Sequence, residues 1–129
     1  MLKELLIERL SRVDGLVAAY LFGSRARGDG SERSDVDIGL WLERAPSSFD
    51  ELPLELTADL EQRLALPVDV VVLNGAPSDL VHRVLRDGVL LVERDRSARI
   101  RLEVRSRNDY FDMTAFRRDY RRGRRSPQP

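Results

Sequence analysis

Hydrophobic residues follow two different spacings along the chain, and each spacing predicts a kind of element. Near the N-terminus, leucines three or four residues apart predict a helix that ends at Asp14 and Gly15. Short continuous apolar runs predict buried strands over residues 16–22, 36–42, 68–73 and 89–92. Helical and strand patterns therefore alternate, which indicates an α/β fold with one small mixed sheet packed with helices.

Three more helices are expected between and after these strands. One covers residues 47–66, with Ser47 or Ser48 as its N-cap, and Pro67 ends it. A second covers residues 77–86, and a third runs from about 95 to 122. The residues of the third helix that we expect to face the core are Ile100, Val104, Tyr110 or Phe111, and Phe116.

The length of 129 residues is that of one domain. We expect a core over residues 1–94, a helical extension of the same domain over 95–122 and a disordered tail over 123–129. The sequence has no cysteine, which excludes disulfides and thiolate metal sites and fits a reducing compartment. A signal-peptide pattern and an apolar run of the ~20 residues that span a bilayer are both missing. We therefore expect a cytoplasmic protein that does not act at a membrane.

The net charge of zero hides two halves of opposite sign. Residues 1–93 hold 10 Lys and Arg against 17 Asp and Glu, while residues 94–129 hold 12 Arg against 5 Asp and Glu. The basic segment mixes aspartates among its arginines, which suits a protein partner better than a nucleic-acid backbone. We expect four of its arginines to contact that partner: Arg117, Arg118, Arg121 and Arg122. The alternative is a solvated helix face.

Aspartates interrupt two of the apolar runs. Asp35 and Asp37 lie one residue apart, so both point to one face of a strand, and Asp69 interrupts the run over residues 68–73. Carboxylates side by side repel, and a divalent cation such as Mg²⁺ or Mn²⁺ relieves that repulsion with oxygen ligands. Three carboxylates could hold two ions about 4 Å apart, as in phosphoryl displacement. The alternative is three carboxylates that merely face water.

A glycine–serine pair precedes these aspartates. Gly23 permits a tight turn and a close backbone approach, and Ser24 adds a hydroxyl for a phosphate oxygen. Arg25 and Arg27 are cations that could neutralise a triphosphate. The alternatives are that Ser24 is a helix N-cap and that both arginines are solvated.

Gly23-Ser24, ten residues and then Asp35-Val36-Asp37 resemble the G-S-x10-D-x-D signature of the DNA polymerase beta nucleotidyltransferase superfamily. The stretch "FGSRARGDGSERSDVDIGL" is similar to that of the minimal nucleotidyltransferases. The Arg-rich C-terminal segment with "NDYFDMTAFRRDY" resembles the MntA-like antitoxins of HEPN–MNT toxin–antitoxin pairs.

The resemblance implies a role for each matching residue. Asp35, Asp37 and Asp69 are implied metal ligands and catalytic residues, with Asp69 helping to deprotonate the attacking hydroxyl. Gly23 and Ser24 are implied to hold the β and γ phosphates of ATP, with Arg25 in the same nucleotide site. Two Mg²⁺ ions and ATP are the implied cofactor and co-substrate.

The same resemblance implies an acceptor and a partner. In the antitoxins of this family, AMP passes from ATP to a tyrosine of a HEPN ribonuclease toxin and silences it. A hetero-oligomer with such a toxin is therefore expected, without direct binding of nucleic acid. Two alternatives remain open: a nucleotidyltransferase that modifies a small-molecule hydroxyl, and a noncatalytic antitoxin or binding module.

Overall fold

A computed structural model describes residues 2–28, 34–46 and 52–125, with the side chains of 115, 116 and 119–125 outside the description. Four strands and five helices lie in these ranges. In chain order they are α1 Leu2–Leu10, β1 Leu16–Phe22, α2 Ser24–Arg27, β2 Val36–Leu42, α3 Leu52–Leu64, β3 Val68–Val72, α4 Ser78–Asp87, β4 Val89–Glu93 and α5 Arg96–Arg125. No helix in the described part of the chain is long and apolar enough to cross a membrane.

The strands form one mixed sheet in the order β3-β2-β1-β4. β1 lies antiparallel to both β2 and β4, whereas β2 and β3 are parallel. The expected small mixed sheet is confirmed, and β1 and β2 have the predicted bounds. The expected caps Ser47 and Ser48 lie outside the described residues.

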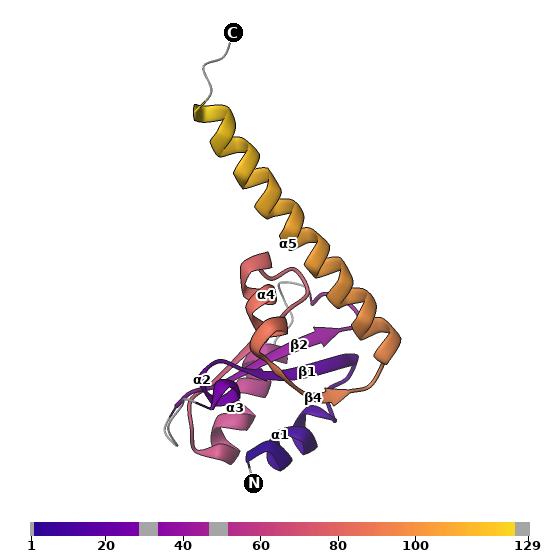
Figure 1. Ribbon diagram of the computed structural model, residues 1–129. Helices are drawn as coiled ribbons and strands as arrows, with labels where there is room; N and C mark the ends of the chain where they lie inside the picture. Colours follow the sequence, from indigo (N-terminus) through magenta and orange to yellow (C-terminus); the bar gives the residue numbers. More distant parts are fainter. Residues whose placement is uncertain (1, 29–33, 47–51, 126–129) are drawn as a thin grey trace.

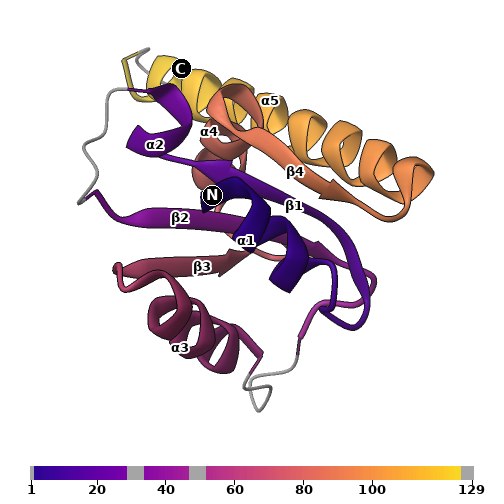
Figure 2. The same cartoon turned by 90° about the horizontal axis from the view of Figure 1, so that it is seen from below.

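Helices cover both faces of the sheet (Figure 1). α1 and α3 pack on one face, where Leu6, Leu10, Leu56 and Leu60 meet the inward-facing residues of β1 and β2. α4 and the first turns of α5 pack on the other face. The buried residues there include Tyr20 and Trp41. Figure 2 looks onto the sheet and shows the strands side by side in the order β3-β2-β1-β4.

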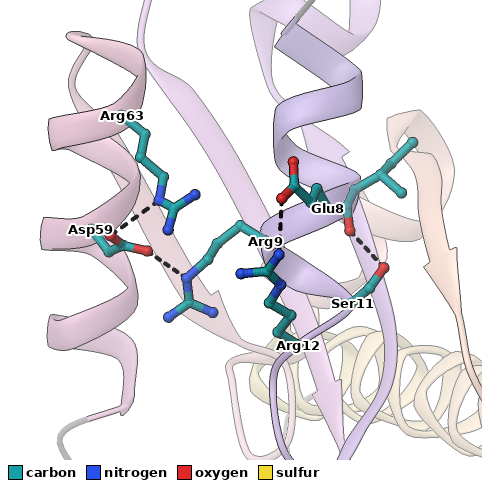
Figure 3. Close-up of polar contacts among 7 residues, drawn as sticks. Glu8, Arg9, Ser11, Arg12, Asp59 and Arg63 are labelled. Carbon is teal, nitrogen blue, oxygen red and sulfur yellow. Dashed lines mark hydrogen bonds and ion pairs between the residues drawn. The ribbon is translucent and has the colours of Figure 1, made fainter.

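An ionic cluster joins the two helices of the first layer (Figure 3). Asp59 of α3 accepts hydrogen bonds from Arg9 of α1 and from Arg63 one turn further along α3. Both contacts hold the pKa of the Asp59 carboxyl below its ordinary value, the contact with Arg9 being the stronger. Arg12, just after α1, also donates to Glu8 of that helix, on the exposed side. The first layer is therefore fixed by charge as well as by its leucines.

The first turns of α5 are held on the sheet by a polar network. The Tyr20 hydroxyl of β1 donates to Glu103 at 2.8 Å, and Arg99 donates to the other oxygen of Glu103 and to Glu93 of β4. Burial, together with the hydrogen bond to Glu103, raises the pKa of the Tyr20 hydroxyl. Beyond this network α5 runs past α4 and away from the sheet (Figure 1).

The face of α5 that meets the domain differs from the one that we expected. The apolar residues of α5 that pack on the sheet are Ala98 and Leu102. Two expected core residues, Ile100 and Val104, are instead exposed by 43% and 47% of their surface. Of the alternatives Tyr110 and Phe111, Tyr110 is half-buried and Phe111 is 61% exposed. The side chain of Phe116 lies outside the described residues. The reason is that a long helix with apolar residues on both sides is oriented by its tertiary contacts, here Tyr20 with Glu103.

We predict that Tyr20→Phe destabilises the protein by about 1–2 kcal/mol, because Glu103 then loses a buried hydrogen-bond donor. Urea unfolding measures the free energy. Tyr110→Phe is the control, since Tyr110 is a half-buried tyrosine of α5 whose ring, retained in phenylalanine, makes its contact with the domain. An equal loss in both variants would contradict the role of the Tyr20 hydroxyl.

Candidate active site

The chain turns sharply where β1 ends. Gly23 follows the last residue of β1 with φ 77° and occupies the N-cap position of the single-turn helix α2. Its carbonyl oxygen accepts hydrogen bonds from the backbone N–H groups of Ala26 and Arg27, which closes the turn. Gly28 ends α2 with φ 81°, again in the left-handed region that favours glycine. The glycines thus fold the "GSRARG" stretch into a compact turn beside the sheet.

Ser24 is the first residue of α2, and Gly23 is its cap. The alternative in which Ser24 serves as the helix N-cap is therefore wrong, because that position belongs to a residue without a side chain. The Ser24 side chain is half-buried at the start of the turn. Its assignment to phosphate binding stays a prediction.

Strand pairing brings two of the predicted aspartates together. Asp37 of β2 lies opposite Asp69 of β3 in the parallel register, and on its other side opposite Phe22, the last residue of β1. The neighbours of Asp37 in β2, Val36 and Ile38, are fully buried against α1 and α3. Alternation along the strands therefore places the two carboxylates together on the opposite face.

Gly23 borders the Asp37 carboxylate directly. A Cβ atom on Gly23 would lie 2.2 Å from Oδ2 of Asp37, closer than any real contact. The lack of a side chain at this position thus leaves the space that the carboxylate occupies. Sequence reasoning gave Gly23 a turn and an approach to phosphate, but the contact with Asp37 links residues fourteen apart and has no local signal.

The carboxylates are coupled electrostatically. Partial burial, followed by the charges of Asp69 and Asp35, raises the pKa of the Asp37 carboxyl, and the guanidinium of Arg27 partly offsets this effect. Asp69 is exposed, and Asp35 is exposed one residue before β2 begins. The three predicted residues are therefore close enough to repel one another, with Asp37 at the centre.

Arg25 has a structural contact that the sequence did not indicate. Its Nε donates to the backbone carbonyl of Ser34 at 2.8 Å. Ser34 immediately precedes Asp35, so this hydrogen bond connects α2 to the segment that carries the first aspartate. The alternative of a merely solvated Arg25 is wrong, and its predicted contact with nucleotide stays a prediction.

The donor chemistry of this cluster fits a divalent cation. The side-chain donors of Asp35, Asp37 and Asp69 are all carboxylate oxygens, the ligand type of Mg²⁺ and Mn²⁺. Within residues 2–28, 34–46 and 52–125, no three acidic, histidine or cysteine side chains are already arranged around a common point as metal ligands. Burial, followed by repulsion from Asp69 and Asp35, raises the pKa of Asp37, and a bound cation would favour the ionised carboxylate against both effects.

Arg27 extends the charged site toward α4. Its guanidinium lowers the pKa of the Asp87 carboxyl at the end of α4, after the larger effect of the hydrogen bond from Arg86 to Asp87. Sequence reasoning did not include Asp87, which ends a helix and lies far from the signature. Arg27 thus acts on the carboxyl of Asp37 as well as on that of Asp87.

Comparisons with known proteins agree with this arrangement. Residues 4–97 match the family described as "Polymerase beta, Nucleotidyltransferase". Over 69 residues the chain is 41% identical to the protein adenylyltransferase MntA of Thermococcus cleftensis. The aligned segment covers 54% of this chain and 68% of that protein.

Solved structures show the same fold along nearly the whole chain. A toxin–antitoxin crystal structure with AMP-PNP superimposes with a TM-score of 0.80 at 24% identity, over 96% of this chain and 98% of the other. A tri-AMPylated HEPN toxin of Shewanella oneidensis in complex with an MNT antitoxin gives a TM-score of 0.74 at 21% identity, over 97% of both chains.

We predict that Asp37→Asn stabilises the metal-free protein at neutral pH, because it removes a carboxylate that its neighbours disfavour. The folded-state pKa is raised, so the gain is absent below the unfolded carboxyl pKa of about 3.9 and grows as the pH rises through the folded pKa. Thermal unfolding in EDTA from about pH 3 to about pH 8 measures this gain in stability.

Asp59→Asn is the matched control for this titration, because the pKa of Asp59 is shifted in the opposite direction by Arg9 and Arg63. Its stabilising contribution is present above the unfolded pKa and is lost as the pH falls through the folded pKa. Asp59→Asn should therefore destabilise the protein at neutral pH. Changes of the same sign in both variants would contradict the proposed repulsion at Asp37.

We also predict that Gly23→Ala impairs the carboxylate site more than the fold. Gly28→Ala is the control, since both glycines have positive φ but only a Cβ on Gly23 would meet Asp37. Both variants should lose unfolding free energy, about 1–3 kcal/mol each, because alanine is strained at these positive φ angles. Only Gly23→Ala should weaken Mn²⁺-ATP binding, by about 10-fold or more, as measured by calorimetry. Equal affinities in the two variants would contradict the contact.

Proposed function

The chain belongs to the polymerase beta nucleotidyltransferase family, and we propose that it transfers AMP from ATP to a tyrosine hydroxyl of a cognate HEPN ribonuclease toxin, which it thereby neutralises. The observation that carries the proposal is the pairing of Asp37 with Asp69 beside the Gly23 turn. A charged pair at this place in an apolar sheet serves no packing purpose, and it suits a ligand that carries cations and phosphates.

The relatives support the two halves of the proposal. The Thermococcus relative is a protein adenylyltransferase, which supports AMP as the group transferred and a protein as its acceptor. The Shewanella complex contains a tri-AMPylated HEPN toxin, which supports a toxin of that class as the acceptor. The AMP-PNP complex supports ATP as the donor.

The reaction is a displacement at the α-phosphorus of ATP. The tyrosine hydroxyl oxygen of the toxin forms a bond to that phosphorus, and the bond from phosphorus to the bridging oxygen of the β-phosphate breaks. Pyrophosphate leaves, and the toxin keeps AMP as a phosphodiester on its tyrosine. The hydroxyl proton passes to the carboxylate of Asp69, which is exposed at the edge of the site.

The residues around the turn hold the nucleotide. We assign the β and γ phosphates to the Gly23 backbone and the Ser24 hydroxyl, because both lie in the turn that borders Asp37. Arg25 fixes the segment before Asp35 through the Ser34 carbonyl and adds positive charge to the nucleotide site. The compact turn thus places backbone, hydroxyl and cation together.

Asp35, Asp37 and Asp69 would hold up to two Mg²⁺ ions, which when bound supply positive charge to the phosphates and to the leaving pyrophosphate. Repulsion from Asp35 and Asp69 acts on the Asp37 carboxylate, and bound cations would offset it. We place the reaction in the cytoplasm, where ATP is available and where a chain without cysteine needs no oxidising compartment.

The test uses the wild-type protein, its cognate HEPN toxin and ATP labelled at either the α or the γ phosphate. We expect label from the α-phosphate on the toxin and none from the γ-phosphate, with mass spectrometry locating AMP on a tyrosine. The doubly substituted Asp35→Asn/Asp37→Asn protein and excess EDTA should each abolish transfer while circular dichroism shows an intact fold.

Other outcomes identify other activities. Full transfer by the double variant or in EDTA would contradict the carboxylate site. Toxin binding and inhibition without any label would indicate a noncatalytic antitoxin. Pyrophosphate release that needs a small hydroxyl compound instead of the toxin would indicate a small-molecule acceptor.

A further inference from the structure

The outer side of α5 carries apolar residues that the domain does not cover. Ile100, Val104 and Phe111 expose 43%, 47% and 61% of their surface. At 3.6 residues per turn, the three positions fall within about 40° of one another around the helix axis. They therefore form one stripe along the helix, which we call the outer stripe.

The outer stripe points away from the domain. α5 packs on the sheet through Ala98 and Leu102, and further along, the Tyr110 ring stacks on His82 of α4 with centroids 3.9 Å apart and planes 5° apart. Ala98 and Leu102 lie on the opposite side of the helix from the stripe, and Tyr110 lies about a quarter of a turn away from it. The stacked pair holds α5 in this orientation, so the stripe cannot turn inward without losing it. Phe111 meets Tyr110 edge-on and stays on the outside.

The stripe continues as a seam with the spacing of paired helices. Among the exposed residues of α5, those on the side of the stripe follow one another from Ile100 at steps of four, three, four, three and four residues. The members of this seam are Ile100, Val104, Arg107, Phe111, Thr114 and Arg118. Alternating steps of four and three are typical of a helix that packs lengthwise against another helix. The chemistry of the seam is therefore apolar with two cations, over about five turns.

The charges beside the stripe have one sign. Arg107 and Arg118 lie in the seam, and Arg96 precedes Ile100 by four residues on the same side. The acidic residues Asp109 and Asp112 lie away from it around the helix, and Asp109 lines a hollow with Trp41 against the domain. A partner surface must accordingly be apolar at its centre and acidic at its edges.

We propose that the outer stripe is the surface through which this protein binds its HEPN toxin, and that the toxin contributes a helix with apolar residues flanked by acidic ones. This inference rests on the proposed function for the identity of the partner. It refines the expectation that the arginines near the C-terminus make the contact. Arg117 lies 3.7 Å from Asp79 of α4, on the side facing the domain, and Arg121 and Arg122 have side chains outside the described residues.

A second copy of this chain fits the stripe poorly. Arg107 lies between Val104 and Phe111, so two stripes paired about that point would bring two arginines together. No acidic residue of the seam is available to separate them. Like charges in close contact destabilise such pairing, whereas an acidic helix would neutralise Arg107 and Arg118.

The test measures the affinity of the whole protein for its cognate HEPN toxin. The triple variant Ile100→Gln/Val104→Gln/Phe111→Gln should bind the toxin about 10- to 100-fold more weakly. Its fold should survive, since all three side chains are exposed. Leu54→Gln is the matched control, because Leu54 of α3 is an apolar residue exposed by 74% far from α5, and its affinity should equal that of the wild type.

A second pair of variants tests the charges. Arg107→Glu/Arg118→Glu should slow association with the toxin and lessen its dependence on salt, whereas Arg44→Glu, an exposed arginine after β2, should not. Mn²⁺-ATP affinity should be unchanged in all of these variants. A triple variant that binds the toxin as tightly as wild type overturns the proposal.

Two further outcomes separate this surface from the reaction. If the wild type forms a dimer by light scattering and the triple variant is a monomer, the occupant is a second copy and the proposal is overturned. If the toxin binds to the wild type and not to the triple variant but is never labelled by ATP, the surface is supported and the proposed reaction is not. A toxin that does not bind the wild type overturns the surface directly.

Discussion

The placement of Asp37 next to Asp69 is the constraint on which the site depends. This position is unfavourable for an ionised carboxylate, since burial and repulsion from Asp69 raise the pKa of Asp37. The apolar neighbours impose it: Val36 and Ile38 in one strand, and Val68 in the other, are buried on the face that α1 and α3 cover. A shift of one residue in either strand would expose those side chains. Hydrophobic packing on one face therefore fixes charge on the other.

The two faces of the sheet consequently have different roles: one is packed against helices, and the other carries the candidate site. On the first face the cover is complete, with leucines in the core and Arg9, Asp59 and Arg63 bridging the helices above it. On the second face α4 packs close to β2, where Gly39 leaves room for Val84. Asp37, one step earlier on the same side of β2, is only half-buried beside the Gly23 turn. Binding groups can occur there because the helical cover ends.

Local patterns were enough to predict the strands and the shared face of Asp35 and Asp37, whereas the pairing of Asp37 with Asp69 depends on the placement of β3 beside β2. Each strand is a short, predominantly apolar run, and the period of two along a strand dictates which residues share a face. The contact between Gly23 and Asp37 and the hydrogen bond from Arg25 to Ser34 could not be predicted in this way, because both depend on how the turn lies against β2. Ser24 was ambiguous for a similar reason: N-cap and first helical residue differ by one position.

The orientation of α5 was mistaken because the helix carries two apolar sides. Ala98 and Leu102 together carry less apolar surface than Ile100, Val104 and Phe111. Hydrophobicity alone therefore predicts that the second set faces the sheet, although it is exposed. Polar contacts determine the orientation of α5. Because Tyr20 donates to Glu103 and Arg99 donates to Glu93, the larger apolar side chains face outward. A network that commits polar groups to the interior while leaving apolar groups in water is costly for an isolated domain. That cost is offset if the outward side chains become buried against another protein, and the same contacts that misled the sequence prediction then define the binding surface.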